Sequence, residues 1–460
     1  MTNVKPTSRR ISRRDFLALS SKGIFAGLVA VSTPGAASVV TGGLRAGATG
    51  AASLIPAYQA AVKRYMRLVA TDGFIALPGR SEPLYVFGFR EVLQSDLLSA
   101  SPVPATAIAA PIDDLDIYKG KVQNPAPIIA VDQGDELYLT LTNIGLVGRP
   151  DLDDSHTIHW HGFRNPVALF DGVPEVSIAV PVGRDFRYFY RAGPVDPAPG
   201  TYIYHCHFED SEHVQMGMTG VVFIRPAQNF TGAAGGPAAR LGGNAGSPVM
   251  GYAYNDGVAP GDGASTAYDR EFTLLLNEID TRPHDGLLAV QEFVWSDYKP
   301  NYWVINGRSY PYTIEPNVDP NDEGNPLHSQ PISSLIQCNA GDRVLLRFAN
   351  LGYQQHALVA PGIRLRVIGE DATVLRSPSG ANLSYYTNTL FLGPGEARDV
   401  MFVAPAKVGA GTYDTYYLKN RSYFKQTNNG QTGLGGMVTE IRVYPTGYQP
   451  NQSAPNETYS

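Results

Sequence analysis

Short apolar runs, three to six residues long, recur along the chain between turn-forming residues. Runs of this length, rich in Val, Ile, Leu, Tyr and Phe, predict β-strands. The clearest of them lie at residues 84–89, 128–131, 137–141, 272–276, 344–348, 365–368 and 390–392. One segment, around Leu54–Val69, favours a helix instead. The pattern therefore predicts a mostly β protein and disfavours a helical bundle or a coiled coil.

Two features recur once in each half of the chain. A turn of the same kind precedes a predicted strand at Gln133–Glu136 and at Asn339–Asp342, and Gly-Thr-Tyr occurs at Gly200–Tyr202 and at Gly411–Tyr413. This repetition indicates two copies of one β-sandwich. The length agrees, because 460 residues exceed what one domain of roughly 100–200 residues needs.

The amino-acid composition supports a mostly β protein and excludes two other classes. Glycine and proline number 48 and 35, which suits short strands joined by many turns, and charged residues make up only 17% of the chain. Because the chain has only two cysteines, it holds neither a disulfide scaffold nor an array of zinc ribbons.

The N-terminus has the layout of an export signal. Paired arginines in Ser12–Leu17 (Ser-Arg-Arg-Asp-Phe-Leu) precede an apolar run from Gly23 to Val31 and then small residues. A charged segment, an apolar core and small residues are typical of a secretory signal, and the paired arginines indicate the twin-arginine route. Cleavage after Ala37 or after Ala48 fits equally well. The signal predicts a periplasmic or secreted protein.

Removal of residues 1–48 makes the chain more acidic. It leaves 29 basic and 41 acidic residues, so the formal net charge changes from −6 to −12. An acidic exported protein is a poor candidate for binding nucleic acid or an anionic membrane surface. We therefore expect no nucleic-acid partner and no membrane partner.

Six of the nine histidines lie in two short stretches, His156–His161 and His205–His213. Side chains in a strand alternate between its two faces, so His159 shares a face with His161, and His205 shares a face with His207. Cys206 then points to the opposite face. The sorted groups are His156, Cys206, His213 and Met218 on one side, and His159, His161, His205 and His207 on the other.

Both groups have the chemistry of transition-metal sites. Two histidines and a cysteine with a weak axial methionine are the ligands of a blue-copper site, and four imidazoles suffice for one or two further metal ions. Cys206 lies between His205 and His207, so the two predicted sites are joined through covalent bonds. Met216 is an alternative axial ligand, although Met218 fits the pattern better.

These motifs resemble those of the multicopper oxidase family. The resemblance rests on His156–Gly162, Phe170–Pro174 and Gly200–His207 through Met218, with weaker features at Tyr302–Arg308 and Gly341–Arg343, and it spans roughly residues 82–445. It implies an all-β fold of two cupredoxin-like Greek-key β-sandwich domains and an oxidase that reduces dioxygen to water. The reducing partner would be a small substrate or a redox protein.

The resemblance also implies a role for each ligand. His156, Cys206, His213 and Met218 would bind the type 1 copper, His159 would fall on a type 2 copper, and His161, His205 and His207 on a type 3 pair. Cys206, His205 and His207 would carry electrons between the sites. The implied domains are a signal peptide (1–48), an N-terminal extension (49–80), a copper-binding domain (81–226), a linker (227–268), a second domain without evident copper ligands (269–446) and a polar tail (447–460).

Two features depart from the family pattern. The spacing from Cys206 to His213 is two residues longer than usual, and the chain has two His-x-His pairs where the family cluster uses four. Three readings follow. A homo-oligomer completes the cluster between chains; the protein is a type 1 copper electron carrier or copper-binding protein; or it resembles copper nitrite reductase.

The remaining candidates have plainer expected roles. We expect structural roles for His284, His328 and His356, and a buried free thiol at Cys338. Four acidic residues flank the histidine motifs and either relay protons and orient ligands or form a solvated loop face: Asp154, Glu209, Asp210 and Glu212.

Overall fold

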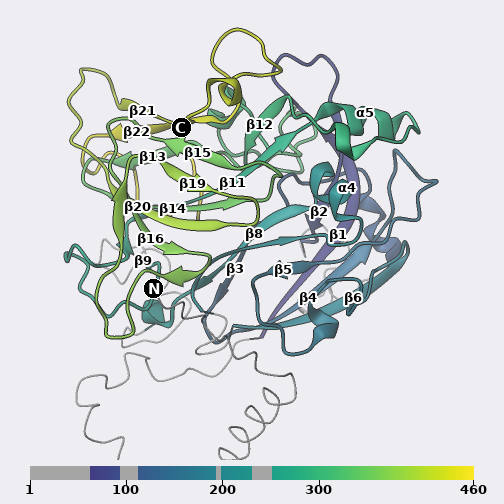
Figure 1. Cartoon of the computed structure of the whole chain (residues 1–460), viewed down its shortest axis with the longest axis horizontal. Helices are drawn as coiled ribbons and strands as arrows, with labels where there is room; N and C mark the ends of the chain where they lie inside the picture. Colours follow the sequence, from purple (N-terminus) through teal and green to yellow (C-terminus); the bar gives the residue numbers. More distant parts are fainter. Residues whose placement is uncertain (1–62, 94–111, 193–197, 231–250, 460) are drawn as a thin grey trace, which may run out of the picture. The chain divides into compact units, whose positions relative to one another are not determined.

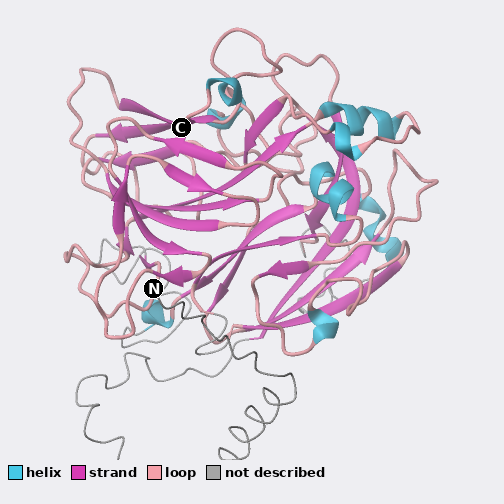
Figure 2. Ribbon diagram, viewed as in Figure 1, coloured by secondary structure: helices cyan, strands magenta, loops and turns pink. Residues whose placement is uncertain are grey.

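The computed structural model describes residues 63–93, 112–192, 198–230 and 251–459 (Figure 1). The described chain is built mostly from strands with a few short helices (Figure 2), which confirms the all-β prediction. Among the described residues, no helix is long and apolar enough to cross a membrane. The proposed signal peptide lies outside the described residues.

Two sheets form the first sandwich. One sheet has the order β2-β1-β4-β6 and the other the order β3-β8-β7-β5. Their bounds are β1 Lys63–Ile75, β2 Leu84–Glu91, β3 Ile129–Asp132, β4 Glu136–Asn143, β5 His159–His161, β6 Arg184–Arg191, β7 Gly200–His205 and β8 Thr219–Arg225. The inner faces bury one apolar core, in which Trp160 stacks on Tyr190 with ring centroids 3.9 Å apart.

Two further sheets form the second sandwich. One has the order β12-β11-β14-β20-β16-β17, with β18 also pairing β16, and the other the order β13-β22-β21-β15-β19. The bounds are β11 Arg270–Ile279, β12 Tyr302–Ile305, β13 Ile336–Asn339, β14 Arg343–Asn350, β15 His356–Val359, β16 Leu365–Glu370, β17 Thr373–Val374, β18 Tyr385–Thr387, β19 Leu390–Leu392, β20 Ala397–Val403, β21 Asp414–Asn420 and β22 Val438–Tyr444. A second apolar core lies between them.

Short helices and one small sheet complete the described chain. They are α4 Asp210–Met216, α5 Thr281–Leu288 and the 3₁₀ turns η2 Ile112–Tyr118, η3 Ala168–Phe170, η4 Ala227–Phe230, η6 Trp295–Asp297, η7 Tyr312–Ile314 and η8 Tyr423–Gln426. Strands β9 Gly251–Tyr252 and β10 Ala267–Tyr268 pair within the predicted linker. Residues 231–250 of that linker lie outside the described residues.

The second sandwich repeats the strand pairing of the first. The parallel pairs β1·β4 and β3·β8 correspond to β11·β14 and β13·β22. The antiparallel pairs β7·β8 and β5·β7 correspond to β21·β22 and β15·β21. The predicted internal repetition is therefore present. The two Gly-Thr-Tyr motifs are not equivalent, because Gly200 begins β7 whereas Gly411 precedes the first residue of β21.

A buried polar network joins the two sandwiches. Arg347 of β14 lies 2.6 Å from a Glu271 carboxylate oxygen and 3.5 Å from an Asp399 oxygen, and all three side chains are at most 1% exposed. Thr201 of β7 donates a hydrogen bond to Asp399 (2.5 Å), which brings the first sandwich into this network. An apolar cluster that contains Ile203 of β7 and Leu275 of β11 also joins the two sandwiches.

The helix expected around Leu54–Val69 is wrong for its described part. Residues from Lys63 onward form β1, which pairs with β2 on one side and β4 on the other. Because β1 lies inside the first sheet, residues 63–80 are not a separate N-terminal extension. The spacing of apolar residues in this segment suits a helix, but pairing on both edges and burial from Arg67 to Gly73 determine the structure.

The polar tail makes specific hydrogen bonds with β11 of the second sandwich. The side chain of Gln452 accepts a hydrogen bond from the Glu271 amide (2.6 Å) and donates one to the Glu271 carbonyl (3.0 Å). Asn456 bonds both backbone groups of Thr273 in the same way. These amide side chains substitute for a neighbouring strand where β12 does not reach β11.

Candidate metal centre

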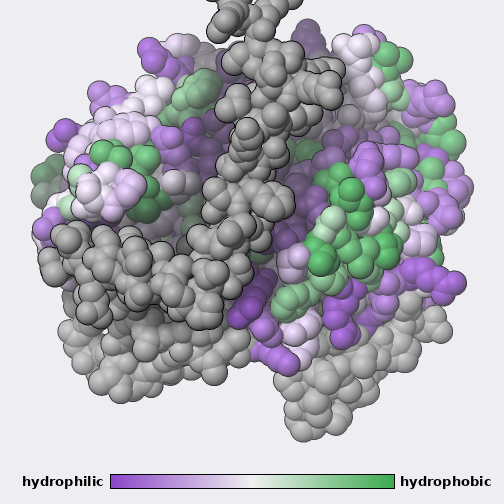
Figure 3. Space-filling view, turned by 60° about the horizontal axis from the view of Figure 1, so that its bottom comes forward, coloured by the Kyte–Doolittle hydropathy of each residue, from purple (hydrophilic) through white to green (hydrophobic). Residues whose placement is uncertain are grey.

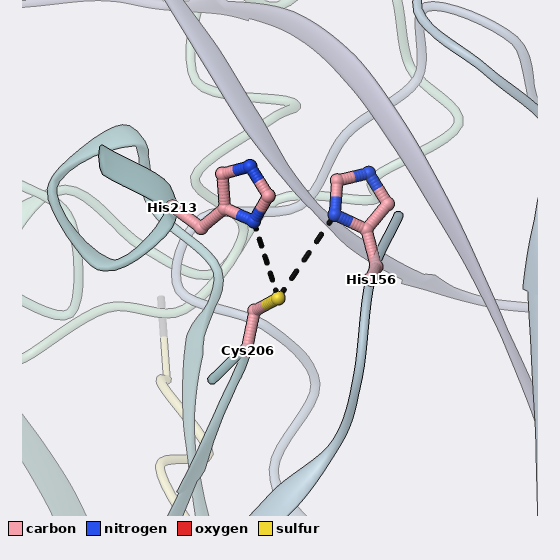
Figure 4. A group of neighbouring side chains, drawn as sticks. All are labelled: His156, Cys206 and His213. Atoms are coloured by element: carbon pink, nitrogen blue, oxygen red, sulfur yellow. Dashed lines mark hydrogen bonds between the residues drawn. The ribbon is translucent and has the colours of Figure 1, made fainter. Parts of the chain in front are cut away.

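The three predicted ligands of the first group converge in the structure (Figure 4). The Cys206 sulfur lies 3.2 Å from Nδ1 of His213 and 3.9 Å from Nδ1 of His156. All three side chains are fully buried, as is Met218. Two imidazole nitrogens therefore face one thiol sulfur in an enclosed space, with a buried thioether from the same segment of chain.

Backbone hydrogen bonds fix the segment that carries three of these residues. The Cys206 amide donates to the Met218 carbonyl (3.1 Å), and the Met218 amide donates to the His213 carbonyl (3.0 Å). The residues between Cys206 and His213 include the start of α4, which places His213 in its last turn. This short helix accommodates the long spacing noted in the sequence. His156 is held from the other side by a bridge to Val180.

Burial sets the protonation of these ligands. It lowers the pKa of His213 to about 4 and that of His156 well below its ordinary value, so both rings are neutral near pH 7 and keep a lone pair for a metal. Burial raises the pKa of the Cys206 thiol to about 12. A buried cation would offset that rise, and the donor set of two imidazoles, a thiol and a thioether fits copper.

The second group lies on the opposite face of the same strands. His159 and His205 are partners in the β5·β7 register, with ring centroids 5.3 Å apart. One nitrogen from each of His159, His161 and His205 lies within 4.8 Å of the others. The His207 ring centroid lies 5.2 Å from that of His159. The structure thus brings all four predicted imidazoles together, and His161 is exposed.

Hydrogen bonds orient two of these rings. Nδ1 of His159 lies 2.6 Å from the Asp171 carbonyl oxygen, and Nδ1 of His205 lies 2.9 Å from the Cys206 carbonyl oxygen. A carbonyl only accepts, so both rings carry their proton on Nδ1 and present a free lone pair at Nε2. Burial lowers the pKa of His159 and lowers that of His205 to about 3. The rings are therefore ready to bind a metal.

Gly172 holds the backbone that orients His159. Its φ is +84°, and a Cβ there would lie 2.2 Å from the Ile158 oxygen and 2.7 Å from the His159 nitrogen. We expect Gly172→Ala to displace His159 and to weaken copper binding at the second group by roughly 10- to 100-fold, because groups that orient a ligand affect affinity on this scale. Copper content after dialysis against graded chelator measures the effect.

The matched control is Gly162→Ala. Gly162 has a similar φ of +78°, but a Cβ there would meet nothing within 4 Å. This variant should bind copper as the parent chain does. Equal losses in the two variants would contradict a positioning role for Gly172.

His284 supports α4 from the second half of the chain, which sequence reasoning did not reveal. Its Nδ1 lies 2.6 Å from the Tyr85 carbonyl oxygen, and its Nε2 lies 3.2 Å from the Gln215 side-chain nitrogen on α4. The ring is fully buried, and burial lowers its pKa to about 4. The spacing of Gln215 and His284 along the chain carries no signal of this contact.

Stability should therefore depend on pH through His284. In the unfolded chain His284 becomes protonated below its ordinary pKa of 6.5, whereas the native ring stays neutral down to about pH 4. Between these two values the unfolded state binds more protons, so the free energy of unfolding decreases as the pH falls. We expect the metal-free parent to lose about 2 kcal/mol more than His284→Gln between pH 7 and pH 5. Urea unfolding at both pH values tests this. Equal losses in the parent and in His284→Gln would contradict this role of His284.

Acidic residues lie beside the first group. One oxygen each of Asp154 and Glu209 lies within 4.8 Å of a His213 nitrogen. Burial raises the pKa of Asp154 to about 6 and that of Glu212 to about 7. Asp154 and Glu209 therefore approach a ligand ring, whereas Asp210 is exposed at the start of α4.

The other predicted structural residues have ordinary partners. Cys338 is a fully buried free thiol, as expected. Nδ1 of His328 lies 2.8 Å from the Asn325 carbonyl oxygen. His356 is buried against Glu278, with 3.0 Å between Nε2 and a carboxylate oxygen. None of these residues belongs to a group of candidate metal ligands found among the described residues.

Comparisons with known proteins agree with this geometry. Residues 117–229, which contain both ligand groups, match the family model for multicopper oxidases. A laccase of rice, Laccase-3 of Oryza sativa subsp. japonica, is 25% identical over 305 residues, which cover 65% of this chain and 42% of the laccase. The chain thus spans about two fifths of the length of this curated relative.

Solved structures show the same fold. The blue copper oxidase of Nitrosomonas europaea is 22% identical with a TM-score of 0.55, covering 83% of this chain and 86% of that one. The copper nitrite reductase of the same organism is 16% identical with a TM-score of 0.50, covering 86% and 98%. At these identities the likeness establishes the cupredoxin-like fold alone.

The family model and the curated relatives add what the fold cannot give. The family implies copper as the metal, and the donor set of the first group fits it. The segment that carries both ligand groups thus matches the multicopper oxidase family, and the chain is similar to laccases over about two thirds of its length.

Proposed function

We propose that the chain is a copper-dependent oxidoreductase of the multicopper oxidase type, which takes single electrons from a reducing substrate and passes them to dioxygen. One observation carries the proposal. The continuous segment His205-Cys206-His207 contributes its thiol to one buried donor group and its two imidazoles to the other. A chain that binds copper in both groups thereby couples them through a few covalent bonds.

Each ligand has a distinct proposed role. His156, Cys206, His213 and Met218 would hold a type 1 copper, and His159, His161, His205 and His207 would hold type 2 and type 3 copper. Copper bound there would supply one-electron redox chemistry and the reduction of dioxygen to water. The protein excludes water from the first group and keeps the imidazoles neutral and oriented.

We further propose that a second copy of the chain completes the histidine group. Four imidazoles are half of a full family cluster, and a two-fold interface would bring eight together. His161 is exposed, so the group is accessible from outside the sandwich. From the second sandwich of the same chain, Gly395 approaches this ring, and a Cβ there would lie 3.3 Å from a His161 carbon.

An exposed apolar segment that follows the group along the chain supports this proposal. Large side chains 39% to 53% exposed follow His161 along the chain before β6 begins: Val167, Leu169, Val176, Ile178 and Val182. Figure 3 shows hydrophobic residues gathered among hydrophilic ones on the face it presents. Burial of such a patch against a second copy would be favourable.

Copper content and oligomeric mass, measured together on copper-matured protein, test the proposal. About five copper ions per pair of chains and dioxygen consumption would support a shared cluster. Ile178→Asp should then dissociate the oligomer and abolish dioxygen consumption while the blue colour remains. Val408→Asp, in an exposed loop of the second sandwich, is the matched control.

The other readings correspond to definite outcomes. About one copper ion per chain, blue and inert towards dioxygen, would indicate an electron carrier. The nitrite reductase reading requires a histidine from the second sandwich of a neighbouring subunit. The position in β21 that corresponds to His205 is Lys419, so the structure offers no imidazole there.

The substrate and the route of export belong to the same proposal. A small reducing compound or a redox protein would give electrons near α4, where His213 and the carboxylates of Asp154 and Glu209 lie close together. The acidic chain is not expected to bind nucleic acid. We propose export by the twin-arginine route to the periplasm or the medium, which N-terminal sequencing of the mature protein would test.

A further inference from the structure

We propose that the second sandwich binds a small oxyanion, a carboxylate or phosphate group, in the cavity that takes the place of the histidine group. The argument begins from Asn420, which occupies the position of Cys206. The Asn420 amide donates to the Met437 carbonyl (2.9 Å), as the Cys206 amide donates to the Met218 carbonyl (3.1 Å). The His356 ring lies beside the Asn420 side chain, with 3.2 Å between Nδ1 of His356 and Nδ2 of Asn420. His156 lies beside the Cys206 side chain in the same way.

This equivalence identifies the residues on the other face of the strands. Lys419 precedes Asn420 as His205 precedes Cys206, and it is paired with Val359 as His205 is paired with His159. Arg421 follows Asn420 as His207 follows Cys206. Pro361 follows Val359 by two residues, as His161 follows His159. Two of the four imidazole positions therefore carry cationic side chains, and the other two carry apolar ones.

All four residues line one cavity of about 720 Å³: Val359, Pro361, Lys419 and Arg421. Its other lining residues include Asn388, Gln426 and Tyr423, which is 82% exposed at the rim. No aspartate or glutamate is among the described residues that line it. Lys419 and Arg421 make no ion pair with any residue in the described part of the chain, so their charges are available to a ligand.

The chemistry of this lining selects an anion. Guanidinium and ammonium groups bind carboxylate and phosphate oxygens through charge-assisted hydrogen bonds. Because both groups are cations, neither side chain offers copper a neutral donor at pH 7. A ligand with two or three oxyanion groups would contact both cations at once. The cavity lies in the sandwich that lacks the copper ligands, so anion binding and copper binding are separable.

A second basic cavity of the same sandwich provides the control. It is lined by Arg343, Arg364 and Arg366, but Arg343 is paired with Asp269 and Arg366 donates to the carbonyls of Gly263 and Ser265. Arg364 is exposed and stacks on Tyr386. Arg364→Gln therefore removes a surface arginine without touching the proposed site.

Calorimetric titration of the copper-loaded protein with inorganic phosphate, and separately with citrate, tests the proposal at constant ionic strength. We expect saturable binding of one anion per chain, weakened about tenfold by Lys419→Gln or Arg421→Gln and lost in the double variant. Phosphate binding alone indicates a phosphate-bearing ligand, and citrate binding alone a carboxylate. Arg364→Gln should bind as the parent does.

Two results would overturn the proposal. One is the absence of saturable heat with both anions, and the other is undiminished binding in the double variant. The type 1 blue colour and the thermal midpoint of each variant check that it is folded. These readouts are independent of anion binding, so loss of binding in a folded, blue variant is assigned to Lys419 and Arg421.

Discussion

Cys206→Ser should abolish both the blue absorption and all turnover of a reducing substrate. Its sulfur lies 3.2 Å and 3.9 Å from the two nitrogens that face it, and its neighbours His205 and His207 belong to the second group. A serine hydroxyl is a poor ligand for a soft copper site, and it removes the sulfur through which the two groups are joined. Visible absorption and dioxygen uptake measure the two losses.

The other buried thiol is the natural control. Cys338 is as completely buried as Cys206 but lies in β13 of the second sandwich, where its sulfur contacts the Arg442 carbonyl oxygen at 3.8 Å. Cys338→Ser should keep the colour and the rate. Retained substrate oxidation in Cys206→Ser would break the assignment of this residue.

Arg347→Met should destabilise the chain by about 3–5 kcal/mol, because it leaves buried carboxylates without their cation. Glu271 and Asp399 both face this guanidinium in a region from which water is excluded, and Arg225 reaches Glu271 only at 3.4 Å. Thr201 ties Asp399 to the first sandwich, so the loss should also loosen the contact between the sandwiches. Chemical unfolding measures the change in the free energy of unfolding.

Arg398→Met is the control, because it removes an arginine whose ion pairs lie at the surface. Arg398 pairs with Glu370, Asp371 and Glu396, whose side chains are 35% to 59% exposed. Such pairs contribute less than about 1 kcal/mol. If Arg347→Met cost no more than Arg398→Met, the buried network would not hold the sandwiches together.

Spacing along strands explains why the sequence could sort the candidate ligands into two groups. A period of two assigns His159 and His161 to one face and separates Cys206 from His205 and His207, and the structure places them accordingly. The same rule cannot place His213, because its position depends on α4. The seven-residue helix that carries His213 leaves no periodic signal in the sequence.

Contacts between distant parts of the chain account for most of what the sequence did not reveal. β1 lies between β2 and β4, and a parallel pair with β4 joins residues more than seventy positions apart. Gln215 and His284 are 69 residues apart, and Glu278 and His356 are 78 apart. Side chains that meet across such separations follow from the fold, not from local propensity.

The amide side chains of the C-terminal segment close one edge of β11 against the addition of a strand from another chain. Where β12 stops short, β11 would present unpaired backbone groups that another chain could extend as an added strand. The side-chain amides of Gln452 and Asn456 each accept a hydrogen bond from one of these backbone N–H groups and donate one to the carbonyl of the same residue. The C-terminal segment thus covers this edge of β11. A deletion that removes the segment would expose backbone groups to which other chains could add strands and aggregate.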